Sequence, residues 1–208
     1  MEIKIVPALI AQNQKELEEK FNKIKSYTSW FHIDVMDGKF VENKSNWFEF
    51  KLSKTHKYEI HLMLDDPMEW IERNYSKGDL IMANIERLGN PQEFIEFLES
   101  KNKEKGIVLN PETPVDKIVP YLKFIEQVNI LCVNPGRYGA PFIPYVIRKI
   151  EYLRKIFSKN IEADGSQNPE TISKTMKAGA NVIVVGSYIQ NSSDLNSTMK
   201  QLKQIKKM

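Results

Sequence analysis

The feature that most constrains the fold is the regular alternation of short apolar runs with amphipathic helical patterns. A strand that is followed by a crossover helix pairs in parallel with the next strand. The apolar runs cover residues 3–9, 30–36, 58–64, 80–85, 105–110, 128–134, 160–164 and 181–186. The helical patterns cover residues 13–26, 67–76, 91–102, 114–122, 142–157, 169–178 and 192–206.

This alternation predicts an α/β fold, and its eight units predict a single (β/α)8 TIM barrel over residues 1–208. The runs are rich in β-branched residues and nearly continuous in apolar character, which is typical of strands covered on both faces. The alternative is a doubly wound open sheet. The sequence contains neither G-x-G-x-x-G nor G-x-x-x-x-G-K-[ST], the motifs that such sheets use for nucleotides. The barrel is therefore favoured.

Local signals mark several helix starts. Asn-Pro pairs at 90–91 and 168–169 combine an N-cap residue with proline at the first helical position, and Thr-Pro at 113–114 predicts a further start. The irregular link is 37–57, which contains the aromatic stretch NWFEF, and we expect a short helix within it.

Charge and cysteine content exclude several classes of protein. The net charge of +3 is small and the 30 basic residues are spread along the chain, so we expect no nucleic-acid partner. The stretch KQLKQIKK near the C-terminus reads as the solvated face of a last helix. The single cysteine, Cys132, allows no intrachain disulfide, and the first residues resemble neither a signal peptide nor a membrane span. We expect a cytoplasmic protein with no membrane partner.

Polar side chains near the exits of the predicted strands suggest a metal site. His32, Asp34, His61 and Asp164 lie in three apolar runs, where an imidazole or a carboxylate is costly to bury unless it is paired or binds an ion. In a barrel the strand exits converge, so the four could hold one divalent cation, Zn²⁺ first and also Fe²⁺, Mn²⁺ or Co²⁺. The alternative is that each is a core residue with its own hydrogen bonds. We expect His56, which precedes its strand, to be exposed.

Two Gly-Ser pairs follow the last two predicted strands. Gly165-Ser166 and Gly186-Ser187 stand where barrels frequently bind phosphate through backbone N–H groups. The alternative is ordinary turn chemistry. Both pairs in adjacent late units favour phosphate binding.

The segment 134–142 (NPGRYGAPF) is a candidate loop over the barrel mouth, the alternative being a plain surface turn. Gly136 and Gly139 are its flexible points and candidate substrate-binding or phosphate-binding residues. Four further residues are candidate substrate contacts: Met36, Met63, Asn134 and Arg137.

Several motifs together resemble the ribulose-phosphate 3-epimerase family. They are PALI, HIDVMDGKFV, HLM, VLNPETP, VNPG with FIP, ADGS and AGANVIVVGS, in order from about residue 5 to residue 188. FHIDVMDG, LNPETPV and DGS also resemble the allulose-6-phosphate 3-epimerase branch.

The resemblance implies a metal-dependent barrel that inverts C3 of a ketose phosphate. By the family's motif His32, Asp34, His61 and Asp164 are the metal ligands, and the two aspartates are also the acid/base pair. It further implies a small-molecule sugar-phosphate substrate and a homo-oligomer, in which the NWFEF stretch is an interface or a lid.

The function so implied is interconversion of D-ribulose 5-phosphate and D-xylulose 5-phosphate. One alternative is D-allulose 6-phosphate as substrate, and another is a catalytically impaired barrel that binds sugar phosphate. Five residues depart from the family's pattern and bear on substrate and turnover rather than on reaction type: Ala8, Asn84, Arg137, Tyr138 and Ala140.

Overall fold

The computed structural model describes residues 3–136 and 139–205. Within those ranges nine strands form one sheet in the order β1-β9-β8-β7-β6-β5-β4-β2-β3, and a further pairing of β1 with β2 closes eight parallel strands into a barrel. The predicted (β/α)8 TIM barrel is confirmed. The strands are β1 (Lys4–Leu9), β2 (Trp30–Asp37), β3 (Lys44–Ser45), β4 (Lys57–Met63), β5 (Leu80–Asn84), β6 (Glu104–Leu109), β7 (Gln127–Leu131), β8 (Asn160–Asp164) and β9 (Val182–Val185).

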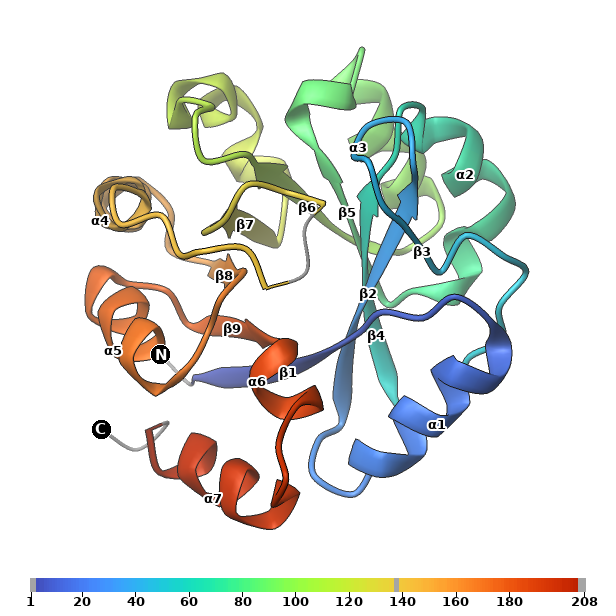
Figure 1. Ribbon diagram of the computed structural model, residues 1–208. Helices are drawn as coiled ribbons and strands as arrows, with labels where there is room; N and C mark the ends of the chain where they lie inside the picture. Colours follow the sequence, from blue (N-terminus) through green and yellow to red (C-terminus); the bar gives the residue numbers. More distant parts are fainter. Residues whose placement is uncertain (1–2, 137–138, 206–208) are drawn as a thin grey trace.

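Helices surround the barrel on its outside (Figure 1). The Asn-Pro signals are confirmed, because Asn90 caps α3 and Asn168 caps α5 in a capping box with Thr171. The α-helices are α1 (Gln14–Ile24), α2 (Pro67–Asn74), α3 (Pro91–Ser100), α4 (Val146–Ile156), α5 (Pro169–Ala178), α6 (Ser187–Gln190) and α7 (Leu195–Ile205). The 3₁₀ helices are η1 (Tyr75–Lys77), η2 (Ile85–Arg87), η3 (Val115–Lys117) and η4 (Val119–Phe124). None of the helices in the described ranges is long and apolar enough to cross a bilayer.

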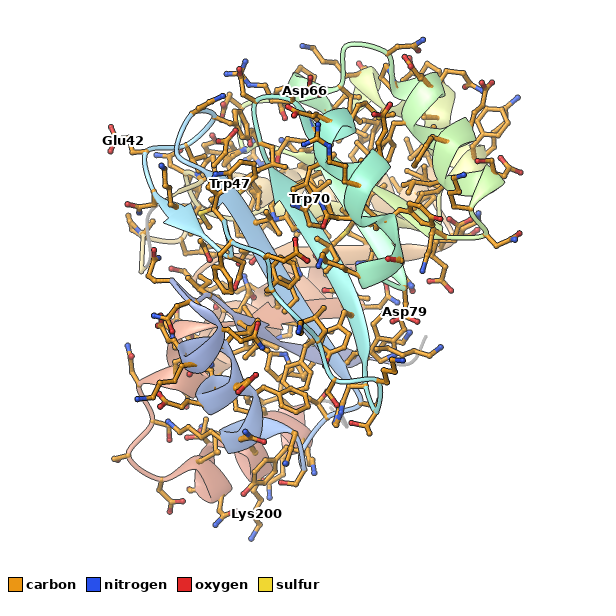
Figure 2. The ribbon with its side chains drawn as sticks, turned by 90° about the vertical axis from the view of Figure 1, so that its right-hand side faces the viewer. Glu42, Trp47, Asp66, Trp70, Asp79 and Lys200 are labelled. Atoms are coloured by element: carbon orange, nitrogen blue, oxygen red, sulfur yellow. The ribbon has the colours of Figure 1, made fainter. Side chains whose placement is uncertain are left out.

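The segments that leave the strands gather at one end of the barrel. Figure 2 shows Glu42 and Asp66, which follow β2 and β4, at the upper end of the molecule, and Asp79, which precedes β5, well below them. The strands therefore deliver whatever side chains stand at their C-terminal ends to a common mouth.

The outer faces of the strands make the main core. Ile33, Val35, Ile60 and Leu62 are completely buried between the barrel and its helices. On the same flank Phe50 stacks on Trp70 of α2, and Trp47 and Trp70 both appear on the side of the molecule shown in Figure 2. Successive residues of a strand face opposite ways, so the residues between these apolar ones point into the barrel.

The barrel interior is mixed. A small apolar cluster of Leu80, Met82, Val108 and Leu131, with Trp30 packed against it, lies apart from the main core. Buried polar side chains share the interior, and they are described with the site below.

Two expected helices are absent from the described structure. Residues 114–122 form 3₁₀ turns instead of an α-helix, because Pro120 removes an N–H donor and disfavours the α conformation in the residue before it. The link 37–57 contains no helix, only the antiparallel strand β3 against the end of β2.

Two single-residue expectations are also wrong. Thr113 does not cap a helix, since its hydroxyl donates to the carboxylate of Glu86. His56 is half-buried rather than exposed, because its ring packs 5.0 Å from that of Phe21 and 5.5 Å from that of Phe31.

Candidate active site

Three strands bring together the four residues that were expected to bind a metal. The Nε2 atom of His32 and the Nδ1 atom of His61 lie 3.1 and 3.2 Å from Oδ1 of Asp34. The same two nitrogens lie 3.8 and 3.7 Å from Oδ2 of Asp164. Strand pairing explains this convergence, because Asp34 on β2 is the register partner of His61 on β4.

These four groups fit a divalent cation. Their candidate ligand atoms all lie within 4.8 Å of one another, and ligands about 2.0–2.2 Å from a tetrahedral ion stand roughly 3.3–3.6 Å apart. Among the described residues no group makes a hydrogen bond with the buried Nδ1 atom of His61, which is what a nitrogen that ligates an ion requires. The sequence prediction of a possible metal site is supported at the level of geometry.

The electrostatics of the four residues are tightly linked. Burial lowers the pKa of His61, but the carboxylates of Asp164 and Asp34 outweigh burial and raise it to about 9. Burial also lowers the pKa of His32, and Asp34 and Glu59 together raise it well above its usual value. Burial raises the pKa of Asp34, and the two histidines more than reverse that shift. An ion that binds these two nitrogens must therefore compete with protons.

A cavity opens above these groups. Asp34 and Asp164 line it, whereas His32 and His61 are fully buried beneath it. All six glycines and serines expected to bind phosphate or substrate line the cavity: Gly136, Gly139, Gly165, Ser166, Gly186 and Ser187. Met36 and Met63 line it as well.

Close packing shapes the loop after β8. Gly165 has φ +101°, and a Cβ added there would lie 2.5 Å from Cγ2 of Val133. Ser166 follows with φ +51°, and its hydroxyl donates to the carbonyl of Ala140. The loop after β8 is thus hydrogen-bonded to the segment after β7, and residues of both segments line the cavity.

The remaining expected contacts are less well placed or fall outside the description. Asn134 is exposed and is not among the residues that line the cavity. Arg137 and Tyr138 lie outside the described residues. Ala8 and Ala140 both line the cavity.

A second polar layer lies below the four candidate ligands. Nδ1 of His32 lies 2.8 Å from Oε1 of Glu59 and 3.7 Å from Oε1 of Glu162. The amide of Gln127 donates to Oε2 of Glu162 at 2.7 Å and lies 3.4 Å from Oε2 of Glu59. Burial raises the pKa of both glutamates; His32 reverses this for Glu59, while the charge of Glu59 raises the pKa of Glu162 further. The pKa of Glu59 therefore lies below the usual value of a glutamate and that of Glu162 lies above it.

On the other side Asn84 supports His61. Its Oδ1 lies 3.0 Å from Nε2 of His61, and its Nδ2 donates to Oδ1 of Asn110 at 2.9 Å. Sequence reasoning noted Asn84 only as a departure from a family pattern and did not single out the layer of glutamates. A signal was present, because Glu59 and Glu162 stand two residues before His61 and Asp164 in apolar runs and must face the same way.

Comparison with known sequences gives a consistent picture. The model of the family described as "Ribulose-phosphate 3 epimerase family" matches residues 4–190. The chain is 32% identical over 199 residues to the ribulose-phosphate 3-epimerase of Schizosaccharomyces pombe, covering 91% of this chain and 87% of that protein. It is 31% identical to the ribulose-phosphate 3-epimerase of Methanocaldococcus jannaschii, covering 97% and 90% of the two chains.

Two solved structures are similar to the chain at identities so low that they show the fold alone. A mutant tryptophan synthase α-subunit from Pyrococcus furiosus superposes with a TM-score of 0.70 at 15% identity and covers all of both chains. The 3-hexulose-6-phosphate synthase of Salmonella typhimurium gives a TM-score of 0.69 at 13% identity and covers 98% of each chain.

Proposed function

The chain belongs to the ribulose-phosphate 3-epimerase family and is an isomerase of that type, and on that premise we propose that it interconverts D-ribulose 5-phosphate and D-xylulose 5-phosphate. The observation that carries the proposal is that Asp34 and Asp164 both line the cavity from separate strands. β9 and β1 lie between their strands in the barrel order, so the two carboxylates approach the cavity from different directions.

Inversion at C3 needs this arrangement. The proton on C3 is next to the C2 carbonyl, and its removal leaves a planar enediolate. A base on one face of that plane and an acid on the other invert the centre, whereas a single carboxylate would return the proton to the face from which it came. Asp34 and Asp164 take these two roles, and the direction of reaction decides which aspartate acts first.

His32, Asp34, His61 and Asp164 would hold the divalent ion. Mixed imidazole and carboxylate ligands favour Zn²⁺ and also accept Fe²⁺, Mn²⁺ or Co²⁺. A bound divalent ion supplies electrostatic stabilisation for the negative charge that develops on the ketose oxygens.

The glycine-serine loops hold the other end of the substrate. Gly165-Ser166 and Gly186-Ser187 line the same cavity as the aspartates. A phosphate bound to their backbone N–H groups would fix the position of C3 between the two carboxylates. Gly136 and Gly139 line the same cavity.

A second candidate substrate is D-allulose 6-phosphate, and an adjoining hollow favours it. That hollow shares Ala8, Ile10 and Met36 with the main cavity and extends toward Gln12 and Lys20. It offers space for an additional carbon and its hydroxyl group.

Assembly, which the family resemblance implies, and compartment, which the single cysteine and the first residues indicate, both stay predictions. We expect a homo-oligomer in the cytoplasm. Trp47, in the NWFEF stretch, is 47% exposed, which is unusual for tryptophan and fits a contact between copies.

The decisive experiment is solvent exchange at C3. In D₂O the metal-loaded protein is expected to place one deuteron at C3 of ribulose 5-phosphate. Proton NMR measures this exchange as loss of the C3 proton signal. Asp34→Asn and Asp164→Asn are each expected to reduce the rate by roughly 10²–10⁴. Asp116→Asn, an exposed residue of η3, is the matched control and should react like the wild type.

Two outcomes would change the proposal. Faster turnover of allulose 6-phosphate than of ribulose 5-phosphate would assign the six-carbon substrate. Absence of exchange with both substrates, in protein that retains its ion, would leave a barrel that only binds sugar phosphate.

A further inference from the structure

Each candidate histidine ligand has its second ring nitrogen against a buried acceptor. Nδ1 of His32 lies 2.8 Å from Oε1 of Glu59, and Nε2 of His61 lies 3.0 Å from Oδ1 of Asn84. Glu59 is 3% exposed and the other three residues are 0% exposed, so solvent water does not compete for these contacts. The two histidines thus use opposite nitrogens toward the carboxylates and toward their supports.

The position of one hydrogen decides whether a histidine can bind an ion. A neutral imidazole carries a single N–H, which can sit on either nitrogen, and only the bare nitrogen can coordinate. An acceptor held against one nitrogen keeps the N–H there and leaves the other nitrogen bare.

We propose that Glu59 and Asn84 are positioning residues that hold His32 and His61 in opposite tautomers. Glu59 keeps the hydrogen of His32 on Nδ1, which leaves Nε2 bare, and Asn84 keeps the hydrogen of His61 on Nε2, which leaves Nδ1 bare. The two bare nitrogens are the ones that lie 3.1 and 3.2 Å from Oδ1 of Asp34.

Both supports are themselves anchored. The amide of Gln127 lies 3.4 Å from Oε2 of Glu59 and donates to the neighbouring Glu162 at 2.7 Å. Nδ2 of Asn84 donates to Oδ1 of Asn110 at 2.9 Å, which keeps the amide oxygen turned toward the imidazole. Neither acceptor is therefore free to rotate away from its histidine.

The supports differ in charge, which gives the inference a measurable asymmetry. The carboxylate of Glu59 increases the basicity of His32 in addition to fixing its tautomer, whereas the neutral amide of Asn84 mainly fixes the tautomer of His61. Loss of the carboxylate is therefore expected to weaken ion binding more than loss of the amide.

The test rests on the proposed function only in that the wild-type protein must bind an ion. Two variants remove an acceptor, Glu59→Leu and Asn84→Leu. Two isosteric variants keep one, Glu59→Gln and Asn84→Asp. Glu104→Gln, on an exposed position of β6, is the control. The dissociation constant for Zn²⁺ is measured by competition with a chromophoric chelator. The histidine tautomers are identified from ¹⁵N chemical shifts of the ion-free protein at a pH above the raised pKa values of the two histidines, where both imidazoles are neutral.

We expect both leucine variants to bind Zn²⁺ about 10- to 100-fold more weakly, with Glu59→Leu the weaker of the two. Their ¹⁵N spectra should show the affected histidine losing its single tautomer. The isosteric variants should recover the tautomer and most of the affinity, and the control should match the wild type. Thermal unfolding of each variant shows that the barrel is intact.

Three results would overturn the inference. Leucine variants with wild-type affinity and spectra would show that the acceptors position nothing. Isosteric variants as weak as the leucine variants would indicate a packing role. Two Zn²⁺ ions per wild-type chain, one lost in Glu162→Gln, would show that Glu59 ligates a second ion with His32 and Glu162, whose candidate ligand atoms also lie within 4.8 Å of one another. A wild-type chain that binds no ion would contradict the proposed function instead.

Discussion

The two faces of the barrel strands differ in chemistry, although alternating residues of the same strands make both. On β4, Ile60 and Leu62 face outward and are completely buried against helices, whereas Glu59 and His61 face inward and are buried against polar partners. Burial of apolar side chains stabilises the fold, while burial of charged groups costs solvation that their partners only partly recover. The comparison indicates that the apolar outer face of the strands stabilises this barrel, while the polar inner face carries the candidate ion-binding and catalytic groups.

The largest effect on stability is expected from a cavity on the outer face. Ile60→Ala should lower the free energy of unfolding by about 2–5 kcal/mol, because Ile60 is 0% exposed and its neighbours cannot all close the gap. Denaturant unfolding measures the change. Ile156→Ala on α4, where the side chain is 44% exposed, should change stability by no more than about 0.5 kcal/mol. Loss of Zn²⁺ from folded Ile60→Ala protein would break the comparison by showing that the faces are coupled.

The inner face should respond to pH in a way that the outer face does not. Because the pKa of His61 is raised to about 9, each pH unit below that value should weaken apparent Zn²⁺ binding about tenfold, and His32 makes the slope steeper. Chelator competition between pH 6.5 and 8.5, roughly the range between the free and the raised pKa of histidine, measures the slope. A flat profile would mean that the histidines are neutral before the ion binds.

The stability of the ion-free protein should fall as the pH rises, whereas Zn²⁺ binding should strengthen. A histidine whose folded pKa is raised contributes stability that is complete below the unfolded pKa and is lost as the pH rises through the folded value. For His61 that loss falls between about 6.5 and about 9. Thermal unfolding of the chelated protein across this range checks the sign.

A smaller loss of stability is expected for substitutions in the loops that follow the strands at the mouth of the barrel. Gly165→Ala should cost about 1–3 kcal/mol and weaken substrate binding, since φ is +101° and the added methyl meets Val133. Gly139→Ala should cost less, because an added Cβ there meets no atom within 4 Å although φ is +73°. Equal losses for both variants would attribute the effect to backbone conformation rather than to packing.

The smallest effect is expected for an apolar substitution inside the barrel. Asn129 is completely buried, its Oδ1 has no hydrogen-bond partner within the described part of the chain, and its Nδ2 reaches Oδ2 of Asp164 only at 3.5 Å. Asn129→Leu should therefore leave stability within about 1 kcal/mol of the wild type or raise it. A loss comparable to that of Ile60→Ala would show that the polar interior also stabilises the fold.

Much of the fold and the candidate ion site could be predicted because period-two alternation fixes which residues share a face. His32 and Asp34 are two apart on β2, and the barrel rule then places Asp164 and His61 at the same mouth. The caps at Asn90 and Asn168 were also predictable, because an N-cap followed by proline is a local signal.

The rest depended on contacts between distant parts of the chain. Thr113 stands before proline as a cap would, but Glu86, 27 residues earlier, accepts its hydroxyl hydrogen. His56 looked like a loop residue, yet Phe21 and Phe31 cover part of its ring. The role of Asn84 depended on His61 being its neighbour in the barrel, which no local pattern encodes.

The ring of His32 touches both polar layers, with Nε2 among the aspartates and Nδ1 among the glutamates. An amino-acid change deep in the cylinder can therefore alter how firmly an ion is held without reshaping the surface that the sugar meets. Such a route would let metal preference drift during evolution while substrate recognition stays constant.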